Sequence, residues 1–162
     1  MKKVLVVGGT GFIGFHIIKE AKKRKFSVYS ISLNRPKNYR YHEGVKYIQA
    51  DISKFESLKQ KLNDNSFDYV INAGGYGEHP DFGYKGIKLI ESHLFGIINL
   101  LHILKKKKIK KFIQIGSSFE YGKIKSPIHE SKKCFPNTPY SIAKISCTNI
   151  LLNLYLNIKF PV

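Results

Sequence analysis

The segment KKVLVVGGTGFIG, residues 2–14, constrains the fold of this chain more than any other stretch. Its β-branched run is typical of a buried strand, and the glycines after it are typical of a tight turn into a helix. Such a turn needs residues without a β-carbon, and it leaves backbone N–H groups at the helix N-terminus to bind a pyrophosphate. Gly8, Gly11 and Gly14 therefore predict a dinucleotide-binding turn; a glycine-rich turn that serves only packing is the alternative.

The remaining sequence alternates short β-rich runs with longer helical segments, a pattern typical of a parallel sheet with crossover helices. From it we expect an α/β fold, a Rossmann-like doubly wound sheet of about five strands in the order 3-2-1-4-5. The expected strands are residues 2–8, 26–32, 45–50, 67–75 and 111–116. The expected helices are residues 11–25, 53–62, 85–106 and 140–157.

Two features of these helices are specific enough to test. Ser53 has the side chain of a helix N-cap and is expected to begin the second helix, which ends at about Leu62. In the third helix, apolar residues recur at helical spacing and predict the face that packs on the sheet. That face consists of Ile87, Ile90, Leu94, Ile97, Leu101 and Leu104.

The length predicts a single domain covering residues 1–162, and the glycine turn indicates that this domain binds NAD(P). Hydrophobic residues make up 43% of the chain, and no uninterrupted apolar run approaches the roughly 20 residues that cross a bilayer, so we expect no membrane partner. The apolar run from Val4 to Val7 is too short for a secretion signal. Cys134 and Cys147 have neither metal-ligand spacing nor a disulfide framework, which predicts no metal and a cytoplasmic location.

The formal net charge of +17 raises the question of a polyanionic partner such as nucleic acid. The basic residues are mostly Lys spread over the whole chain. The densest run, residues 105–111, lies at an expected helix C-terminus, where cations complement the helix dipole, and it has no interleaved aromatic residues. We therefore expect no nucleic-acid partner, and keep polyanion binding as a third class of function.

The end of the second expected strand predicts which dinucleotide binds. NAD sites usually place a carboxylate there for the ribose 2′-hydroxyl, whereas the 2′-phosphate of NADP requires a cation. No Asp or Glu occurs between Glu20 and Glu43, and the position is filled by Ser32, with Arg35 nearby. The sequence therefore favours NADP(H), with NAD(H) as the alternative. Asp51 ends the third strand, where a carboxylate reaches the adenine amino group; a plain turn residue is the alternative.

Tyr140 and Lys144 lie four residues apart, which places both side chains on one helix face with β-carbons about 5–6 Å apart. A phenol has an unperturbed pKa near 10, so proton exchange near neutral pH requires a cation beside it. Three other pairs share this spacing, namely Tyr84/Lys88, Tyr121/Lys125 and Tyr155/Lys159. Only Tyr140 follows a proline at the start of the helix after the fifth strand, where Ser117 can converge on the same substrate oxygen.

Five short motifs follow one another in order, namely GGTGFIG (8–14), DI (51–52), NAGG (72–75), SSFEYG (117–122) and PYSIAK (139–144). Together they resemble the extended short-chain dehydrogenase/reductase family, in its NAD-dependent epimerase/dehydratase branch that acts on nucleotide sugars. The resemblance covers essentially the whole chain. It implies that Tyr140 is the general acid/base, that Lys144 holds the nicotinamide ribose, and that Ser117 hydrogen-bonds the reacting oxygen.

The resemblance also implies a set of residues that border the cofactor. They are Gly8, Thr10, Gly11, Phe12, Ile13, Gly14, Ser32, Arg35, Asp51, Ile52, Asn72, Ala73, Gly74, Tyr140 and Lys144. Simpler roles stay open, because Ser117 could cap the strand and Asn72 could bond the neighbouring backbone. Family members often dimerise through the helices that begin here near Lys85 and Tyr140. Leu151, Leu154 and Leu156 could serve that contact or cover the sheet.

Three departures from the family pattern refine the expected function. Ser118 and Phe119 stand where the dehydratases carry an Asp-Glu pair, so we expect epimerisation or 4-keto reduction rather than loss of water. His93 stands where the family usually has an Asn that supports the active site. The family usually runs to about twice this length, so the substrate domain is expected to be missing, and the fifth strand becomes an edge unless another segment covers it. A non-catalytic dinucleotide-binding module left by truncation is the alternative.

Overall fold

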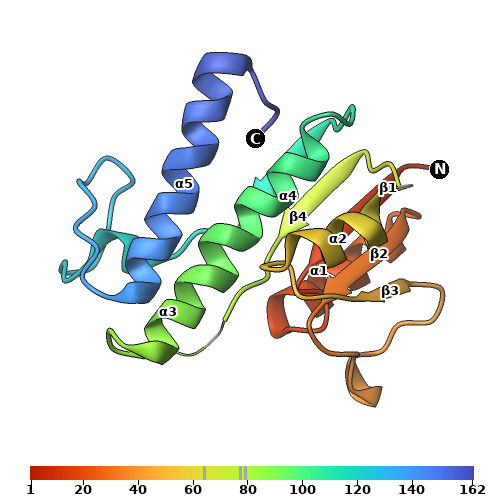
Figure 1. The fold of residues 1–162 in the computed structure, drawn as a ribbon, viewed down its shortest axis with the longest axis horizontal. Helices are drawn as coiled ribbons and strands as arrows, with labels where there is room; N and C mark the ends of the chain where they lie inside the picture. The colour runs from red at the N-terminus through yellow and green to blue at the C-terminus, as the bar shows by residue number, and fades with distance from the viewer. Residues whose placement is uncertain (64, 77, 79) are drawn as a thin grey trace.

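The computed structural model describes residues 1–63, 65–76, 78 and 80–162, and its centre is a parallel five-stranded sheet (Figure 1). The strands are β1 (Lys3–Val7), β2 (Ser27–Ser32), β3 (Lys46–Gln49), β4 (Tyr69–Asn72) and β5 (Lys111–Gln114). The helices are α1 (Phe12–Lys23), α2 (Phe55–Leu62), α3 (Tyr84–Ile90), α4 (Gly96–Leu104) and α5 (Pro139–Ile158). The strand order is β3-β2-β1-β4-β5, which confirms the predicted fold class.

The core has two layers because successive side chains of a strand point to opposite faces of the sheet. In β1, Leu5 and Val7 belong to the larger cluster, which also takes side chains from α2, α4 and α5. Val4 and Val6 belong to a smaller cluster with residues of α1. Strands buried on both faces explain the continuous apolar runs in the sequence.

The long third helix is confirmed, and the predicted buried face is correct in α4 but not throughout α3. A π-helical segment, η2 (Glu91–Phe95), separates α3 from α4. In α3, Leu89 is fully buried, whereas the predicted Ile87 is 57% exposed. The predicted positions in α4, Ile97, Leu101 and Leu104, are buried as expected.

The continuous helix from Tyr84 to Leu104 has a mean hydropathy of 1.4 in its most apolar window. Within the part of the chain that the structure describes, this is one helix whose length and apolar composition are sufficient to span a membrane. Core helices of globular proteins meet the same criteria, and 44% of that window is buried here. In Figure 1 this helix crosses the molecule between α5 and the sheet.

The edge of β5 is partly covered by the end of the chain. The backbone N–H of Phe112 donates to the carbonyl of Pro161 at 2.6 Å, and the rings of Phe112 and Phe160 lie 6.1 Å apart. In α5, Leu151 is buried in the main core and Leu154 packs against it, whereas Leu156 is 65% exposed. Two of the three leucines therefore cover the sheet. On the α1 face, β4 and β5 border an open apolar groove of about 680 Å³.

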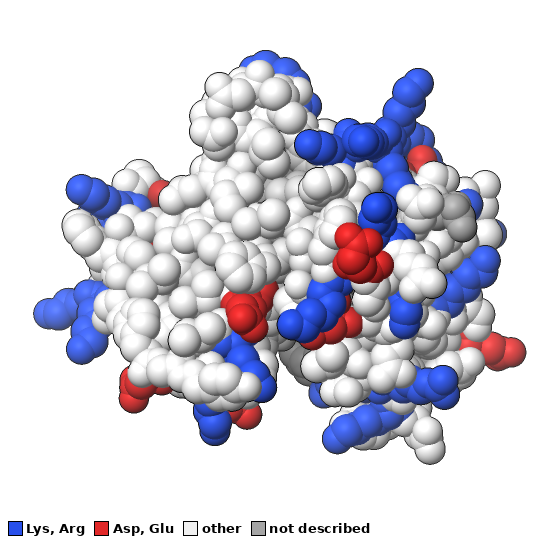
Figure 2. All heavy atoms as spheres, in the orientation of Figure 1, with Lys and Arg blue, Asp and Glu red and all other residues white. Residues whose placement is uncertain are grey.

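The lysine run at the end of α4 makes a specific structural contact. Lys107 Nζ donates to the carbonyls of Leu62 at 2.7 Å and Asn63 at 2.8 Å, where α2 ends. The Lys107 ammonium therefore donates hydrogen bonds to carbonyl groups at the C-terminus of α2. It also lies just beyond the C-terminus of its own helix, α4. Figure 2 shows the other Lys and Arg side chains scattered over several parts of the visible surface rather than gathered in one patch.

Candidate active site

A groove of about 370 Å³ lies at the C-terminal edge of the sheet, between the ends of β1, β2, β3 and β4. The parallel register brings these ends together, since Val7 is paired with Ile31 of β2 and with Asn72 of β4. Eight of the residues predicted to border a cofactor line this groove. They are Gly8, Thr10, Gly11, Ser32, Asp51, Ile52, Ala73 and Gly74.

Two glycines of the first turn are required by close contacts. Gly8 has a φ of +76°, and a β-carbon there would lie 2.6 Å from Gly74 Cα. A β-carbon at Gly14 would lie 2.2 Å from the carbonyl oxygen of Gly8. Both distances are far below van der Waals contact, so the turn can approach β4 and fold back on α1 only with glycine at these positions.

The N-terminus of α1 opens toward this turn. Gly11 is the N-cap, and within residues 1–63, all described, α1 has no side-chain cap bond and no acidic residue in its first turn. The first backbone N–H groups of a helix then remain as donors for an anion. The side chains of Phe12 and Ile13 are 68% and 48% exposed and line the apolar groove on the α1 face. Neither residue belongs to the lining of the groove at the C-terminal edge of the sheet.

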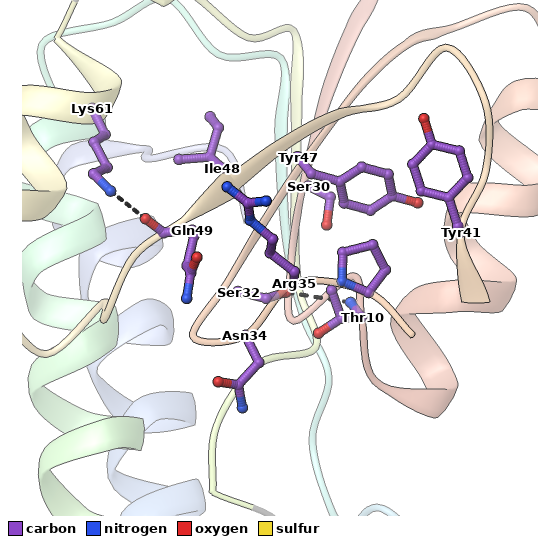
Figure 3. Close-up of a pocket in the computed structure, with 11 residues that line it drawn as sticks. Thr10, Ser30, Ser32, Asn34, Arg35, Tyr41, Tyr47, Ile48, Gln49 and Lys61 are labelled. Atoms are coloured by element: carbon purple, nitrogen blue, oxygen red, sulfur yellow. Dashed lines mark hydrogen bonds between the residues drawn. The ribbon is translucent and has the colours of Figure 1, made fainter. Parts of the chain in front are cut away.

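A second pocket, of about 740 Å³, adjoins the end of β2. Thr10, Ser32 and Arg35 line it, and the Arg35 side chain extends across it toward Ile48 (Figure 3). The Thr10 N–H donates to Ser32 Oγ at 3.3 Å, which ties the glycine turn to β2. Its lining, drawn wholly from the described residues, contains the cations Arg35 and Lys61 and no carboxylate.

The end of β3 forms a turn closed by Asp51. Its Oδ1 accepts from the Ser53 N–H at 2.9 Å and from the Ser53 hydroxyl at 2.7 Å. The prediction that Ser53 caps α2 is wrong, because this bond holds its side chain and Lys54 is the N-cap. Asp51 thus has the turn role proposed as its alternative and also borders the groove.

Asn72, at the end of β4, lies behind the groove rather than in its lining. The side chain is 3% exposed, its Nδ2 donates to Gln114 Oε1 at 2.8 Å, and its Oδ1 accepts from the Gly74 N–H at 3.1 Å. It therefore fixes the chain that follows β4, in line with the simpler alternative. Ala73 and Gly74, which it positions, face the groove.

Tyr140 lies in the first turn of α5, where local sequence fixes the start of the helix. Thr138 is the N-cap, its hydroxyl accepts from the Ser141 N–H at 3.1 Å, and Pro139 occupies the first helical position. The Tyr140 ring meets the rings of His93 and Phe119 edge-on, with centroids 5.4 Å and 5.9 Å away. The phenol is thus held between η2 and the turn after β5.

Lys144 follows one helical turn after Tyr140 and is 5% exposed. Its Nζ donates to the backbone carbonyl of Ile115, at the end of β5. Burial lowers the pKa of the Lys144 ammonium, while the nearby Cys147 and Glu120 act in the opposite direction. The lysine therefore joins α5 to the segment that carries Ser117.

Ser117 begins the short 3₁₀ helix η3 (Ser118–Tyr121) directly after β5. Its Oγ accepts from the Phe119 N–H at 3.3 Å, so the serine does cap local structure. Phe119 of this turn contacts Tyr140, and Ile115, two residues before Ser117, binds Lys144. The fold therefore brings the segments of all three predicted catalytic residues into contact.

His93 connects these residues to the groove. It is 7% exposed, and its Nε2 lies 3.1 Å from the carbonyl oxygen of Tyr76, which lines the groove. Tyr76 and Ser92 line the groove but were missed by sequence reasoning. The Tyr76 N–H donates to Ser92 Oγ at 3.1 Å, a contact between distant segments that carries no local signal.

Comparison with known proteins agrees with this arrangement. Residues 4–159 match the model of the NAD dependent epimerase/dehydratase family. The chain belongs to this family. The match covers nearly the whole sequence and confirms the resemblance found from the five motifs.

The family's curated members include a dTDP-D-glucose 4,6-dehydratase of Dictyostelium discoideum, 28% identical over 184 residues. That match covers 100% of this chain and 42% of the relative. The UDP-glucose 4-epimerase of Lactobacillus helveticus is 28% identical over 151 residues, covering 92% of this chain and 46% of the relative. The chain thus spans about half the length of the curated relatives it matches.

Solved structures of the family have the same fold. Pal from Bacillus thuringiensis superposes with a TM-score of 0.89 at 27% identity, over 99% of this chain and 54% of Pal. The UDP-glucose 4-epimerase of Bifidobacterium longum, solved in complex with NAD⁺ and UDP, gives 0.84 at 25% identity, over 96% and 49%.

The two thiols of this family member are expected to react at very different rates. Cys147 is 1% exposed, and burial raises the pKa of its thiol to about 11, whereas Cys134 is partly exposed. At pH 8 the elevated pKa leaves about 100-fold less thiolate than a thiol of ordinary pKa. With a thiol reagent under native conditions, we expect one equivalent to react quickly and the second only on unfolding. A Cys134→Ser variant should lose the fast phase, and two fast equivalents would contradict the burial of Cys147.

Proposed function

We propose that this chain is the dinucleotide-binding part of a nucleotide-sugar epimerase or 4-keto reductase that uses Ser117, Tyr140 and Lys144. The observation that carries the proposal is the contact network around Tyr140, which links its phenol to the Ser117 turn on one side and to the groove, through His93, on the other. Family membership supports a nucleotide-sugar substrate. We take this substrate class from the names of the relatives, which refer to dTDP-D-glucose and UDP-glucose.

The residues at the groove fit a nicotinamide dinucleotide. The glycine turn has no β-carbon where a pyrophosphate would approach, and the open N-terminus of α1 provides N–H donors for its oxygens. We assign to Lys144 the role of holding the nicotinamide ribose, and Ala73 and Gly74 line the groove beyond β4. When bound, this group supplies the oxidation and reduction of the substrate carbon.

Residues of the chain itself carry out the proton transfer to and from the substrate oxygen. The Tyr140 phenol exchanges a proton with the substrate oxygen, and the Lys144 ammonium, one turn away, stabilises the phenolate charge. Ser117 Oγ donates a hydrogen bond to the same oxygen, with the Phe119 N–H fixing its position. Ser118 and Phe119 supply no acid for a leaving hydroxyl, which favours epimerisation or ketone reduction over dehydration.

The pocket beside β2 favours NADP(H) over NAD(H). A 2′-phosphate needs a cation and hydroxyl donors, and Arg35, Thr10 and Ser32 line this pocket together. NAD(H) remains the alternative, since NAD is the cofactor in the Bifidobacterium complex.

Substituting Arg35→Glu should raise the dissociation constant for NADPH about 10- to 100-fold, the effect of losing a charge-assisted hydrogen bond. The dissociation constant for NADH should change by less than about threefold, because NADH has no 2′-phosphate. Titration calorimetry with both cofactors measures the ratio. Lys37→Glu is the matched control, because it makes the same charge change in the same loop outside the pocket lining. Equal losses for NADPH and NADH would rule out a role of Arg35 in cofactor choice.

Calorimetric titration with NADPH and NADH, followed by an assay of NADPH consumption with a 4-keto sugar nucleotide, tests the function as a whole. Binding with turnover supports the enzyme. Binding without turnover supports the alternative, a dinucleotide-binding module. Absence of binding to either cofactor would overturn both.

The helices that begin near Lys85 and Tyr140 also support the proposed homodimer. Phe95 and Ile98 on one helix, and Leu152 and Leu156 on α5, are all more than 40% exposed. Figure 2 shows a largely uncharged surface over the middle of these helices. A cytoplasmic location, without nucleic-acid or membrane partners, remains the prediction from sequence.

A further inference from the structure

Glu120 is a buried acid that the proposed mechanism does not use. It lies in η3 and is 6% exposed, the lowest value for any carboxylate side chain among the described residues. Ionised side chains are rarely buried to this extent unless hydrogen bonds and a counter-charge hold them. Its surroundings therefore indicate a specific task.

Both carboxylate oxygens of Glu120 are used, and they bind different segments. Oε1 accepts from the Ser117 N–H at 2.8 Å, and Oε2 accepts from the Thr148 hydroxyl at 2.9 Å. Thr148 lies on α5 one turn after Lys144, and its hydroxyl is also 3.3 Å from the Lys144 carbonyl. One side chain thus links the end of β5 to the helix that carries Tyr140 and Lys144.

The carboxylate of Glu120 also acts electrostatically on Lys144 of α5. The titratable groups that act on the Lys144 ammonium are Cys147 from α5 and Glu120 from η3. Tyr140 lies one turn earlier on α5, and its ring contacts His93 of η2. The Cys147 thiol donates to the His93 carbonyl at 3.5 Å and, with a pKa of about 11, is neutral near pH 7. Glu120 is therefore the carboxylate of this set, and it raises the pKa of the Lys144 ammonium against the effect of burial.

We propose that Glu120 is a positioning residue: by accepting from the Ser117 N–H and the Thr148 hydroxyl, it ties the Ser117 turn to α5 and holds its carboxylate against the helix that carries the buried Lys144 ammonium. The proposal rests on the proposed function, because it assigns Glu120 a role in arranging that site. Burial alone disfavours the charged lysine, and a carboxylate close by offsets that cost. Without it, Lys144 would lose its proton at a lower pH and no longer stabilise the Tyr140 phenolate.

Titration of the lysine side chains by NMR, in the ligand-free chain, measures this coupling directly. The Lys144 signal is assigned by its loss in Lys144→Arg. In Glu120→Gln, which keeps the shape and the acceptor for the Ser117 N–H, we expect the Lys144 titration midpoint to move to lower pH. Glu130→Gln is the matched control, because it removes an exposed charge from the following loop and should leave the midpoint unchanged.

Thr148→Val provides the second test, and it decides the proposal if Glu120→Gln does not fold. It removes the tie to α5 but keeps the carboxylate, so the Lys144 midpoint should stay in place. Hydrogen exchange of the Ser117 amide should become about 2- to 10-fold faster, the effect of one lost hydrogen bond. An unchanged Lys144 midpoint in folded Glu120→Gln, or unchanged Ser117 exchange in Thr148→Val, would overturn the proposal. A chain that binds neither NADPH nor NADH would instead overturn the proposed function, since these two measurements need no cofactor.

Discussion

Replacing Tyr140 with phenylalanine is expected to lower turnover by about 10²- to 10⁴-fold, the range for loss of a general acid/base. The ring would keep its contacts with His93 and Phe119, so the fold should be retained. The NADPH dissociation constant should change by less than about threefold, because the lost hydroxyl acts on the substrate oxygen. Single-turnover consumption of NADPH with a 4-keto sugar nucleotide, together with calorimetric titration of NADPH, separates the two effects.

Tyr155→Phe is the matched control for this experiment. Tyr155 lies on the same helix, has a lysine four residues later, and is 46% exposed. Its substitution should leave both turnover and NADPH binding unchanged. If Tyr140→Phe turned over as fast as the unmodified chain, or if both variants lost activity equally, the phenol of Tyr140 would have no specific catalytic role.

The second large effect is expected for Gly14→Ala. A β-carbon at this position would lie 2.2 Å from the Gly8 carbonyl oxygen, so either the turn or the start of α1 must move. Overpacking of this kind costs about 1–3 kcal/mol, which predicts a melting temperature about 3–12 °C lower in a domain of this size. Because the displaced turn is the proposed pyrophosphate cradle, the NADPH dissociation constant should rise at least about tenfold.

Gly44→Ala provides the control for Gly14→Ala. Gly44 also resists substitution, since its φ is +74°, but the nearest atom to a β-carbon there is Lys22 Nζ at 4.0 Å. Its replacement should cost about 1 kcal/mol of stability from backbone strain without affecting NADPH binding. Thermal unfolding and calorimetry on both variants give the comparison. Unchanged NADPH affinity in Gly14→Ala would mean that the turn does not hold the cofactor.

Local sequence was sufficient to predict the elements that position the site. Glycine at positions 8 and 14 is required by contacts within a few residues of the turn or with the strand beside it, and the motif anticipated both. Thr138 and Pro139 fix the start of α5 through neighbouring backbone groups, which is why Tyr140 could be placed at a helix N-terminus. The strand order followed from the alternation of strands and helices.

The features that the sequence did not predict depend on tertiary contacts. Where α3 packs against α5, Leu89 is buried and Ile87 is 57% exposed, so the burial predicted at Ile87 is wrong. Ser53 has the composition of an N-cap, but its hydroxyl is held by Asp51, so composition alone was misleading.

The sequence by itself determined a glycine turn, a strand order and a tyrosine-lysine pair, because each depends on residues close together in the chain. Only the tertiary structure showed that Glu120 joins Ser117 to Thr148 and that His93 lies between the groove and Tyr140. Ser117 and Glu120 are only three positions apart and form a capping box. The bonds from Glu120 to Thr148 and from His93 to Tyr76 join residues 28 and 17 positions apart. They form because the parallel sheet and the packing of α5 bring those segments together, which no local pattern records.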